Sequence, residues 1–479
     1  MQSSTRTLSR PAPRDSAALK SLFPYGLVFV VALYLLVSGQ TLLILRWHYV
    51  GGGAALQKIH PATYLLACGL FLTLVFHSHL RHLMFYRISS DPLLLSFLMA
   101  VIFTAGYDVS LGGASFAPFV DTFVMAIATT VVLLCVPYSA LLVLRRIVDL
   151  FFIFNIVMIF AEMVLHQNFL APYISAVVRT PEESVVLGGF DDGRLSALFG
   201  HPLNAALLFG VYSIANLVSV PMRLSTTALA RLTLSIFAYL AIFPTESRAS
   251  MAVTGLILAF YLMCFGVGIV ARGRVSPIGL GLAMFIVLAF ILAAMGLSDM
   301  GFFDKMLLRF QYDYGSALSR DYALQILQSI SDSALWFGLS QTELSAVQQQ
   351  FNLIAIEISW VNFILVGGLL TTIPLFLTLC LFLFGSLPKY CYFRICFVWL
   401  LVLESTFASN SIWAKSATIT NSLIVAIAML RRHDLTRGTP LILRPIWKPR
   451  HPNKPLKSSH FNRGESWGPP GQGIARRLN

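Results

Sequence analysis

Two short stretches place an arginine and acidic residues together where an apolar run begins. The first, FDDGRLSALFGHP, contains Arg194 and His201, and the second, FPTESRASMAV, contains Glu246 and Arg248. Charged groups at the boundary of a membrane are costly to build, so they usually mark polar chemistry. Guanidinium groups stay charged and hold phosphate oxygens in pairs, whereas carboxylates and imidazoles accept protons. The pattern therefore indicates anion binding combined with proton transfer.

A third group of charged residues lies in the polar segment 298–359. Arg320 opens the stretch RDYALQILQSI, and Glu357 stands among apolar residues in IAIEISW, where burial would make it a better proton acceptor. Ser319 is the expected N-cap of a first helix in this segment. Thr342 is the expected N-cap of a second, ELSAVQQQFNLIAIEISW, that continues into the next apolar run. The segment therefore predicts two helices over the outer mouth of a bundle.

The elements that must position these residues are membrane helices. Hydrophobic residues make up 57% of the 479 residues and charged residues only 11%, far from the balance of a soluble domain. Apolar runs long enough to cross a hydrocarbon core of about 30 Å recur along the chain. They predict an all-α, polytopic membrane protein with about twelve spans. The runs lie near residues 24–45, 61–77, 92–107, 118–137, 147–165, 203–220, 229–244, 250–270, 276–297, 360–384, 391–408 and 413–430.

Lysine and arginine are distributed unevenly between the two sides of these spans. With the N-terminus inside, the inward segments hold 25 of the 34 basic residues, and 16 of the 21 acidic residues lie outside or near the outer boundary. The positive-inside rule then predicts that both termini are cytoplasmic. The net charge of +13 is mainly a property of the cytoplasmic side, and it gives no indication of nucleic acid as a partner.

The sequence divides into three parts. Residues 1–23 form a cytoplasmic arm, and residues 24–430 form the transmembrane bundle, with long periplasmic loops at about 166–202 and 298–359. Residues 431–479 are basic and rich in proline and glycine, a composition that predicts a disordered cytoplasmic tail that contacts anionic lipid. A loop as long as the second one is either functional or carries structure of its own.

The sequence carries no motif for a metal or a nucleotide cofactor. It lacks the phosphate-binding GxxxxGK[ST], the zinc-binding HExxH and the dinucleotide fingerprint. His77, His79 and His82 lie close together, but they have no carboxylate or cysteine partner nearby, which favours a polar collar at the membrane interface over a metal site. We therefore expect neither a metal nor a cofactor.

The order of the motifs resembles a known family. Over about residues 150–385 the chain is similar to the O-antigen ligase and Wzy-type polysaccharide polymerase superfamily. The similarity lies in the order of three features: GRLSALFGHPLNA, then TESRASMA, then a long outer loop with Arg320 ahead of LWFGLS and IEISWVNFILVGGLL. The resemblance implies a multi-pass enzyme of the bacterial inner membrane that works on the periplasmic side. Members transfer a glycan from undecaprenyl diphosphate to an acceptor hydroxyl, without a metal or a nucleotide sugar. The implied partners are an undecaprenyl-diphosphate-linked oligosaccharide, membrane lipid, and other polysaccharide assembly and export proteins.

The resemblance also implies roles for the charged residues. Three arginines from separate outer segments would bind the lipid diphosphate and stabilise the charge on the leaving oxygen: Arg194, Arg248 and Arg320. The candidates for the general base are Glu357, His201 and, third, Glu246. Structural roles are open for the same residues, since Arg248 can neutralise Glu246 and the His201–Pro202 pair is typical of a helix start.

Polymerisation of repeat units is favoured over ligation to a different acceptor. Ligases of this superfamily typically carry a histidine in the long outer loop, whereas residues 298–385 contain none and offer Glu357. Two further classes stay open, a flippase for lipid-linked glycan and an inert scaffold for polysaccharide export. A flippase requires charged residues along a path through several spans, and most charges here lie at the outer boundary instead.

Overall fold

The described part of the chain is helical. The computed structural model describes residues 14–47, 55–110, 116–177, 195–220, 226–271, 316–351, 358–408 and 417–433, with single residues 295, 298, 299, 304 and 356. Apart from an isolated bridge between Cys391 and Arg431, the regular elements within these ranges are helices, which confirms the all-α prediction there. The predicted span 276–297, except residue 295, and the tail from residue 434 onward lie outside the described residues.

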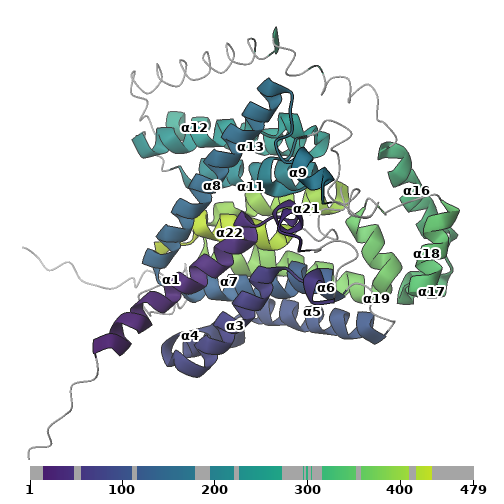
Figure 1. Cartoon of the computed structure of the whole chain (residues 1–479), viewed down its shortest axis with the longest axis horizontal. Coiled ribbons are helices and arrows are strands. Elements are labelled where there is room, and N and C mark those ends of the chain that lie inside the picture. Colours follow the sequence, from purple (N-terminus) through teal and green to yellow (C-terminus); the bar gives the residue numbers. More distant parts are fainter. Residues whose placement is uncertain are drawn as a thin grey trace, which may run out of the picture. The chain divides into compact units, whose positions relative to one another are not determined.

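The helices follow the apolar runs closely, and Figure 1 labels most of them along the chain. The first group is α1 (Arg14–Leu36), α2 (Gly39–Ile44), α3 (Pro61–Phe76), α4 (Ser78–Ser90), α5 (Pro92–Ser110), α6 (Phe116–Phe119), α7 (Met125–Cys135), α8 (Tyr138–Leu165) and α9 (Ala171–Ser175). The second group is α11 (Pro202–Ser219), α12 (Thr226–Leu240), α13 (Arg248–Ala271), α16 (Ser316–Ser329), α17 (Asp332–Phe337), α18 (Gln341–Gln350), α19 (Ser359–Leu381), α20 (Leu387–Tyr390), α21 (Cys396–Ala408) and α22 (Thr418–Leu430). Two π-helical turns, Val120–Val124 and Phe382–Ser386, join α6 to α7 and α19 to α20.

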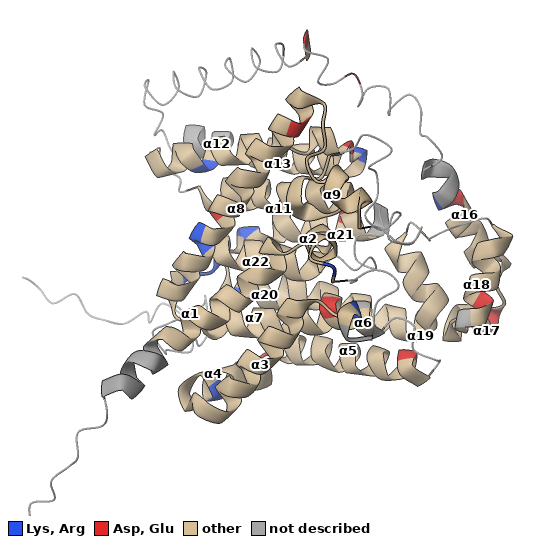
Figure 2. Cartoon of the chain, viewed as in Figure 1, with Lys and Arg blue, Asp and Glu red and all other residues tan. Residues whose placement is uncertain are grey.

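Several helices have the length and composition of membrane spans. Five described segments qualify: Pro92–Ser110, Tyr138–Leu165, Pro202–Ser219, Thr226–Thr245 and Ser359–Tyr390. The pair α3 and α4, bent by 110°, makes a sixth if it counts as one span, and four shorter helices are also apolar. Charged residues are sparse along these helices (Figure 2). By helix length and hydropathy the chain is a multi-pass membrane protein, although the described helices do not reach the predicted twelve spans.

Three helices extend beyond the predicted spans or lie between them. The helix α8 begins directly after Pro137, so Arg145 and Arg146 lie inside a helix and not in an inward loop. Arginine is a good helix former, and the stretch after Pro137 contains no glycine or proline that would interrupt the helix. The helix α1 begins at Arg14, within the predicted arm, and α4 occupies the predicted loop after the second span.

The long outer segment also differs from its prediction. The predicted cap Ser319 lies inside α16, and a short helix, α17, follows it. The helix α18 is capped by Ser340 and not by Thr342: the Ser340 hydroxyl accepts from the Glu343 N–H, while the Glu343 carboxylate accepts from the Ser340 N–H. This reciprocal capping box satisfies two backbone donors at once. The helix ends at Gln350 and does not continue unbroken into α19.

The helix α11 forms the centre of the bundle. It is almost wholly buried and packs against α12, α13, α21 and α22. Gly210 permits the closest approach, because a Cβ atom there would lie 2.7 Å from the Thr254 hydroxyl of α13 and 2.6 Å from the Leu401 side chain of α21. Three helices therefore meet at Gly210, and any larger residue would separate them.

Polar contacts join segments predicted to lie outside. We call this region the outer end, and it includes Gln40, His60, Asp121, His201 and Arg248. There the Asp121 carboxylate accepts from the His60 N–H across 3.0 Å, and the Gln40 amide donates to the turn before α11. Both contacts connect two segments predicted on the same side, as alternating spans require.

Polar contacts also join segments predicted to lie inside, a region that we call the inner end. Asp149 and Arg231 form a bidentate ion pair with two distances of 2.7 Å. Asp91 accepts hydrogen bonds from Ser386 at 2.6 Å and from Lys389 at 3.1 Å. Burial raises the pKa of Asp91, but these two bonds and the Lys389 charge outweigh that effect, and the net pKa is lowered. The inner end is held by completed charge pairs.

Candidate functional site

The two arginine-bearing motifs lie against each other at the outer end. The backbone N–H of Leu195 donates to the carbonyl of Pro244 across 3.2 Å. Leu195 directly follows Arg194, and Pro244 shortly precedes Arg248. Arg194 itself lies outside the described residues, yet its chain neighbour is fixed beside the second motif. The backbone thus brings together two segments that the sequence assigns to one site.

Buried amide side chains hold the turn of the first motif. Gln40, which is fully buried, donates from Nε2 to the Ser196 hydroxyl at 3.3 Å and to the carbonyl of Gly200. The Asn155 carbonyl oxygen accepts from the Leu198 N–H at 2.9 Å. Gly200 has a φ of 89°, a conformation that favours glycine. Side chains from α2 and α8 therefore fix the approach to α11, as preorganisation of a site demands.

His201 has a structural role at one of its ring nitrogens. Its Nδ1 accepts a hydrogen bond from the Leu203 N–H at 3.1 Å and so caps α11, with Pro202 at the first helical position. The side chain is half-buried and has a further partner. Because Nδ1 serves as the cap, any proton transfer by this ring would have to use Nε2. The expected helix start is confirmed, and the role of His201 as a base stays a prediction.

Glu246 and Arg248 flank the turn into α13. Glu246 adopts a left-handed conformation with a φ of 56°, which is uncommon for a residue other than glycine. Arg248 is the first residue of α13. Both side chains are half-buried, and each has an interaction partner. The N-terminus of a helix carries partial positive charge, so a guanidinium placed there strengthens a field that attracts anions.

Arg320 interacts with a residue that the sequence analysis did not select. Its guanidinium lies half-buried on α16 and interacts electrostatically with the carboxylate of Glu404 on α21. The Nε of Arg320 and the Oε2 of Glu404 are buried and have no hydrogen-bond partner in the described part of the chain. Buried polar atoms are nearly always paired, so these two atoms are open to a polar ligand or to water, as are other buried atoms of the described residues such as the Nε of Arg145 and of Arg431.

Arg248 and Glu404 lie at a similar depth on neighbouring helices. Arg394, just before α21, hydrogen-bonds Tyr261 of α13, so these two helices run antiparallel with their inner ends together. Leu401 of α21 and Thr254 of α13 both lie beside Gly210, so they stand at the same depth in the bundle. Glu404 is three residues farther along α21 toward the outer end, and Arg248 is six residues farther along α13 toward the same end. At about 1.5 Å per residue, the two stand about 4.5 Å and about 9 Å nearer the outer end. Leu401 and Glu404, three residues apart, share one face of α21.

Glu357, the first candidate base, lies outside the described residues. Its neighbours Ile356 and Ile358 are buried in an apolar cluster formed by α16, α18 and the start of α19. Ala323 and Ile326, on the same helix as Arg320, belong to this cluster. The chain on both sides of Glu357 is therefore packed against the helix that carries Arg320.

The outer segment also fits into a break in α19. Gly368 interrupts the helix with a φ of 68° and a ψ of 174°. A Cβ atom at Gly368 would lie 2.2 Å from the Trp336 carbonyl, and one at Gly338 would lie 2.4 Å from the Val366 carbonyl. Two glycines thus let the backbones of the loop after α17 and of α19 touch directly.

Hydrogen bonds secure this junction on both sides. The Leu339 N–H donates to the Leu365 carbonyl at 2.7 Å, next to the break. The Tyr107 hydroxyl of α5 donates to the Phe337 carbonyl at 2.9 Å. Irregular backbone within a membrane helix is tolerated where neighbouring chain satisfies it, and these contacts do so. The helices α16 to α18 are therefore anchored to a span.

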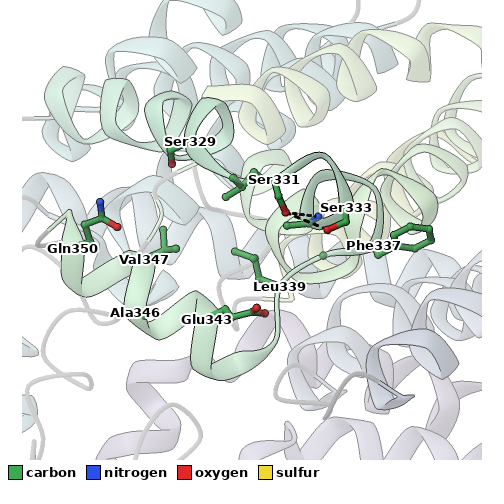
Figure 3. A pocket seen from close by; sticks show the side chains of 12 residues that line it. Ser329, Ser331, Ser333, Phe337, Leu339, Glu343, Ala346, Val347 and Gln350 are labelled. Carbon is green, nitrogen blue, oxygen red and sulfur yellow. Dashed lines mark hydrogen bonds between the residues drawn. The ribbon is translucent and has the colours of Figure 1, made fainter.

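A cavity of about 500 Å³ lies among the helices of the outer segment (Figure 3). Its lining is Ser329, Ile330, Ser331, Ser333, Ala334, Phe337, Gly338, Leu339, Glu343, Ala346, Val347 and Gln350. Hydroxyl, carboxamide and carboxylate groups alternate with apolar ones, and the lining includes no lysine or arginine. Hydrogen bonds from the Ser340 hydroxyl and N–H lower the pKa of Glu343, so this carboxylate is ionised at neutral pH. The cavity suits a neutral polyhydroxylated ligand better than a phosphate.

Sequence reasoning missed the carboxylates inside the spans. An ionisable residue in an apolar helix such as CFVWLLVLESTFA is a functional candidate by default, and this signal would have selected Glu404. Asp121 and Glu162 also lie buried within spans. Both oxygens of Asp121 accept hydrogen bonds, whereas the Oε2 of Glu162 has no partner among the described residues. Glu404 interacts electrostatically with Arg320, one of the predicted site arginines.

Histidine clustering does not produce a metal site in the described part of the chain, where no group of three or more His, Cys, Asp or Glu is arranged to hold an ion. His77 instead caps α4 by accepting from the Leu80 N–H. Comparison with known protein families, with curated proteins and with solved structures finds no match.

Proposed function

We propose that this chain is a metal-independent glycosyltransferase of the polysaccharide polymerase type in the bacterial inner membrane. It has about twelve spans with both termini in the cytoplasm, as the apolar runs and the basic inward segments indicate. It transfers an undecaprenyl-diphosphate-linked glycan to a sugar hydroxyl of a second lipid-linked repeat unit on the periplasmic face. Its other partners are membrane lipid and proteins of polysaccharide assembly and export.

One observation carries the proposal: outer segments far apart in sequence supply arginines to one end of the bundle. The Leu195–Pro244 hydrogen bond joins the first two motifs, and Arg248 opens α13 in the second. Arg320 reaches α21 through Glu404, which lies at a similar depth on a helix packed against α13. Paired guanidinium groups at a helix N-terminus are suited to a diphosphate just above the bilayer.

The reaction follows from this arrangement of charge. The acceptor oxygen forms a bond to the anomeric carbon of the donor glycan, and the bond from that carbon to the phosphate oxygen breaks. The electron pair leaves with undecaprenyl diphosphate, and a base takes the acceptor proton. Arg194, Arg248 and Arg320 would stabilise the charge that develops on the leaving oxygen. Positioning and electrostatics supply the catalysis, and no covalent enzyme intermediate is required.

The cavity beside α18 supports a glycan as the second substrate. Ser329 lies nine residues after Arg320 on α16, about 13 Å along the helix axis. The uncharged hydroxyl and amide groups of the lining therefore stand beyond the arginines, where the sugars of a lipid-linked acceptor would extend. A ligase would use the same donor site with a different acceptor, and it remains the alternative. A flippase is less consistent with charges gathered at one end of the bundle.

Substitution of Arg248 tests the proposal. Arg248→Ala should lower polymer synthesis by roughly 10²-fold, since removal of one preorganised donor costs about that much. Arg248→Lys should be nearly as damaging, because an ammonium keeps the charge but loses the planar two-pronged contact. Polymer amount and length are measured in a deletion strain that carries each variant, with protein abundance held equal.

The matched control is Lys58→Ala, which removes an exposed cation from another outer segment. It should leave synthesis within about twofold, because exposed charges contribute little. Full activity of Arg248→Lys, or equal loss in the control, would show that the arginines are a structural collar. The deletion strain adds a second criterion: single repeats on lipid indicate a polymerase, free polymer a ligase, and cytoplasmic lipid-linked units a flippase.

A further inference from the structure

We propose that Glu404 is the general base of the transfer reaction, an inference that rests on the proposed function. It would take the proton from the acceptor hydroxyl as that oxygen bonds to the anomeric carbon. The C–O bond to the diphosphate breaks in the same step, and the electron pair departs with the leaving group. The proton on Glu404 then returns to water, so that the carboxylate is ready for the next transfer.

The position of Glu404 in its helix is the first argument. It lies in an otherwise apolar segment of α21, one turn before the helix ends at Ala408. A carboxylate inside a membrane helix is expensive and is retained mainly where it acts on a pathway or a reaction. The residues that follow, Ser405 and Thr406, are buried. Glu404 itself is half-buried and lies near the outer end.

The second argument is its incomplete pairing. Arg320 balances the charge of Glu404, yet the Oε2 of the carboxylate and the Nε of the guanidinium are both buried and unpartnered in the described part of the chain. A purely structural pair is expected to complete its hydrogen bonds, as Asp149 and Arg231 do at the inner end. One oxygen of Glu404 is thus left for a donor that arrives with the substrate, and a sugar hydroxyl is such a donor.

The third argument is geometric. The face of α21 that carries Leu401 and Glu404 is turned toward Gly210 of α11 and Thr254 of α13. Arg248 begins α13 about 4.5 Å farther out by the helical rise. Glu404 therefore lies within one helical turn of Arg248 in depth, close to the level at which the diphosphate would bind. The positive charge of Arg320 acts on Glu404 electrostatically, and it would act on the phosphate in the same way.

Glu404 also avoids the difficulties of two earlier candidates. The Nδ1 of His201 is occupied as the cap of α11. Glu246 lies in a left-handed turn between two helices, which ties its backbone to the geometry of the loop. Glu404 stands on a regular helix that is packed on both sides, and rigid placement is what a base requires.

Three variants test this role in the full-length protein in membranes. Glu404→Gln keeps the size and removes the basic oxygen, so polymer synthesis should fall by 10²-fold or more, with thermal stability in detergent unchanged. Glu404→Asp should retain partial activity. The matched control is Asp332→Asn, which changes an exposed carboxylate on α17 and should remain fully active.

A charge swap separates a base from a structural ion pair. In the double variant Arg320→Glu with Glu404→Arg, the attraction is kept but position 404 can no longer accept a proton. Because Arg320 is also assigned to the diphosphate, inactivity of the swap follows from either role, and the supporting result is loss of activity in Glu404→Gln with stability unchanged. An active swap overturns the proposal. An active Glu404→Gln also overturns it. If Arg248→Ala is inactive in the same assay, the proposed function stands and only the identity of the base is wrong; if Arg248→Ala is active as well, both fail.

Discussion

The inner and outer ends of the bundle use buried carboxylates in opposite ways. At the inner end, Asp91 and Asp149 have hydrogen bonds at both oxygens, from a lysine and a serine in one case and from an arginine and a tyrosine in the other. Toward the outer end, Asp121 is saturated as well, whereas Glu162 and Glu404 each keep a buried oxygen without a hydrogen-bond partner among the described residues. The two inner aspartates are saturated, whereas two of these outer carboxylates are not.

This difference separates structural charge from charge that awaits a ligand. A completed pair repays the cost of burying ions and holds helices in register. A buried ion pair with an unpaired oxygen lowers stability when no substrate is bound. Such a pair is therefore retained mainly where it serves binding or catalysis. Substitutions at the inner end should therefore change stability, whereas substitutions at the outer end should change activity.

The largest expected effect is at the inner ion pair. Asp149→Ala leaves the mostly buried guanidinium of Arg231 without its carboxylate, and this should cost about 3–5 kcal/mol of stability. Thermal unfolding in detergent and protein abundance are the measurements. Polymer made per folded molecule should not change.

A double variant sharpens that result. Asp149→Leu with Arg231→Met replaces the pair with apolar groups of similar volume, and it should recover most of the lost stability. An inactive but stable double variant would contradict the comparison, because it would give the inner pair a functional role.

A smaller effect should appear as a pH dependence of stability. The pKa of Asp91 is lower in the folded protein than in the unfolded chain, so its contribution is present above the ordinary aspartate pKa. The contribution is lost as the pH falls through the lowered pKa. Wild type should therefore exceed Asp91→Asn in thermal midpoint at neutral pH, and the two should converge in acid. A gap that stays constant down to low pH would show that Asp91 stabilises by packing alone.

The smallest effect is expected in the outer helices. Ser340→Ala removes the capping box of α18 and should cost about 1 kcal/mol of local helix stability. Hydrogen exchange should quicken at the first amides of α18, while the global unfolding temperature stays the same. A large decrease in the global unfolding temperature would mean that the outer helices belong to the structural core. It would contradict the proposed difference between the two ends of the bundle.

Much of the fold could be predicted from hydropathy and charge. Apolar runs located the helices. Asp91 contacts Lys389 and Gln40 contacts Ser196, and each contact joins two segments that the basic pairs assign to one side; which side each end faces stays a prediction. Helix boundaries were less predictable, because charge marks a membrane boundary and not the end of a helix. Arg145 and Arg146 continue α8 for this reason.

The site was predictable only in part. A serine followed three residues later by a glutamate, as in Ser340 and Glu343, predicts a capping box. This pattern favours Ser340 over Thr342 as the N-cap of α18. Glu404 was also visible as a carboxylate in an apolar helix. The interaction of Glu404 with Arg320 could not be predicted, because it depends on how α16 packs onto the bundle. Arg194 and Glu357 lie outside the described residues, so their roles stay predictions.

The glycine junction between α17 and α19 has a mechanical consequence. Because the backbones at Gly338 and Gly368 touch with no side chain between them, the contact cannot slide without breaking the bond from Leu339 to Leu365. A displacement of α17 would therefore be transmitted directly to the middle of a span. The non-helical dihedral angles of Gly368 make that residue the expected hinge. A glycan that pulled on the outer helices would bend α19 at Gly368. Its tension would then be transmitted into the membrane-spanning part of α19 and not be absorbed by a loop.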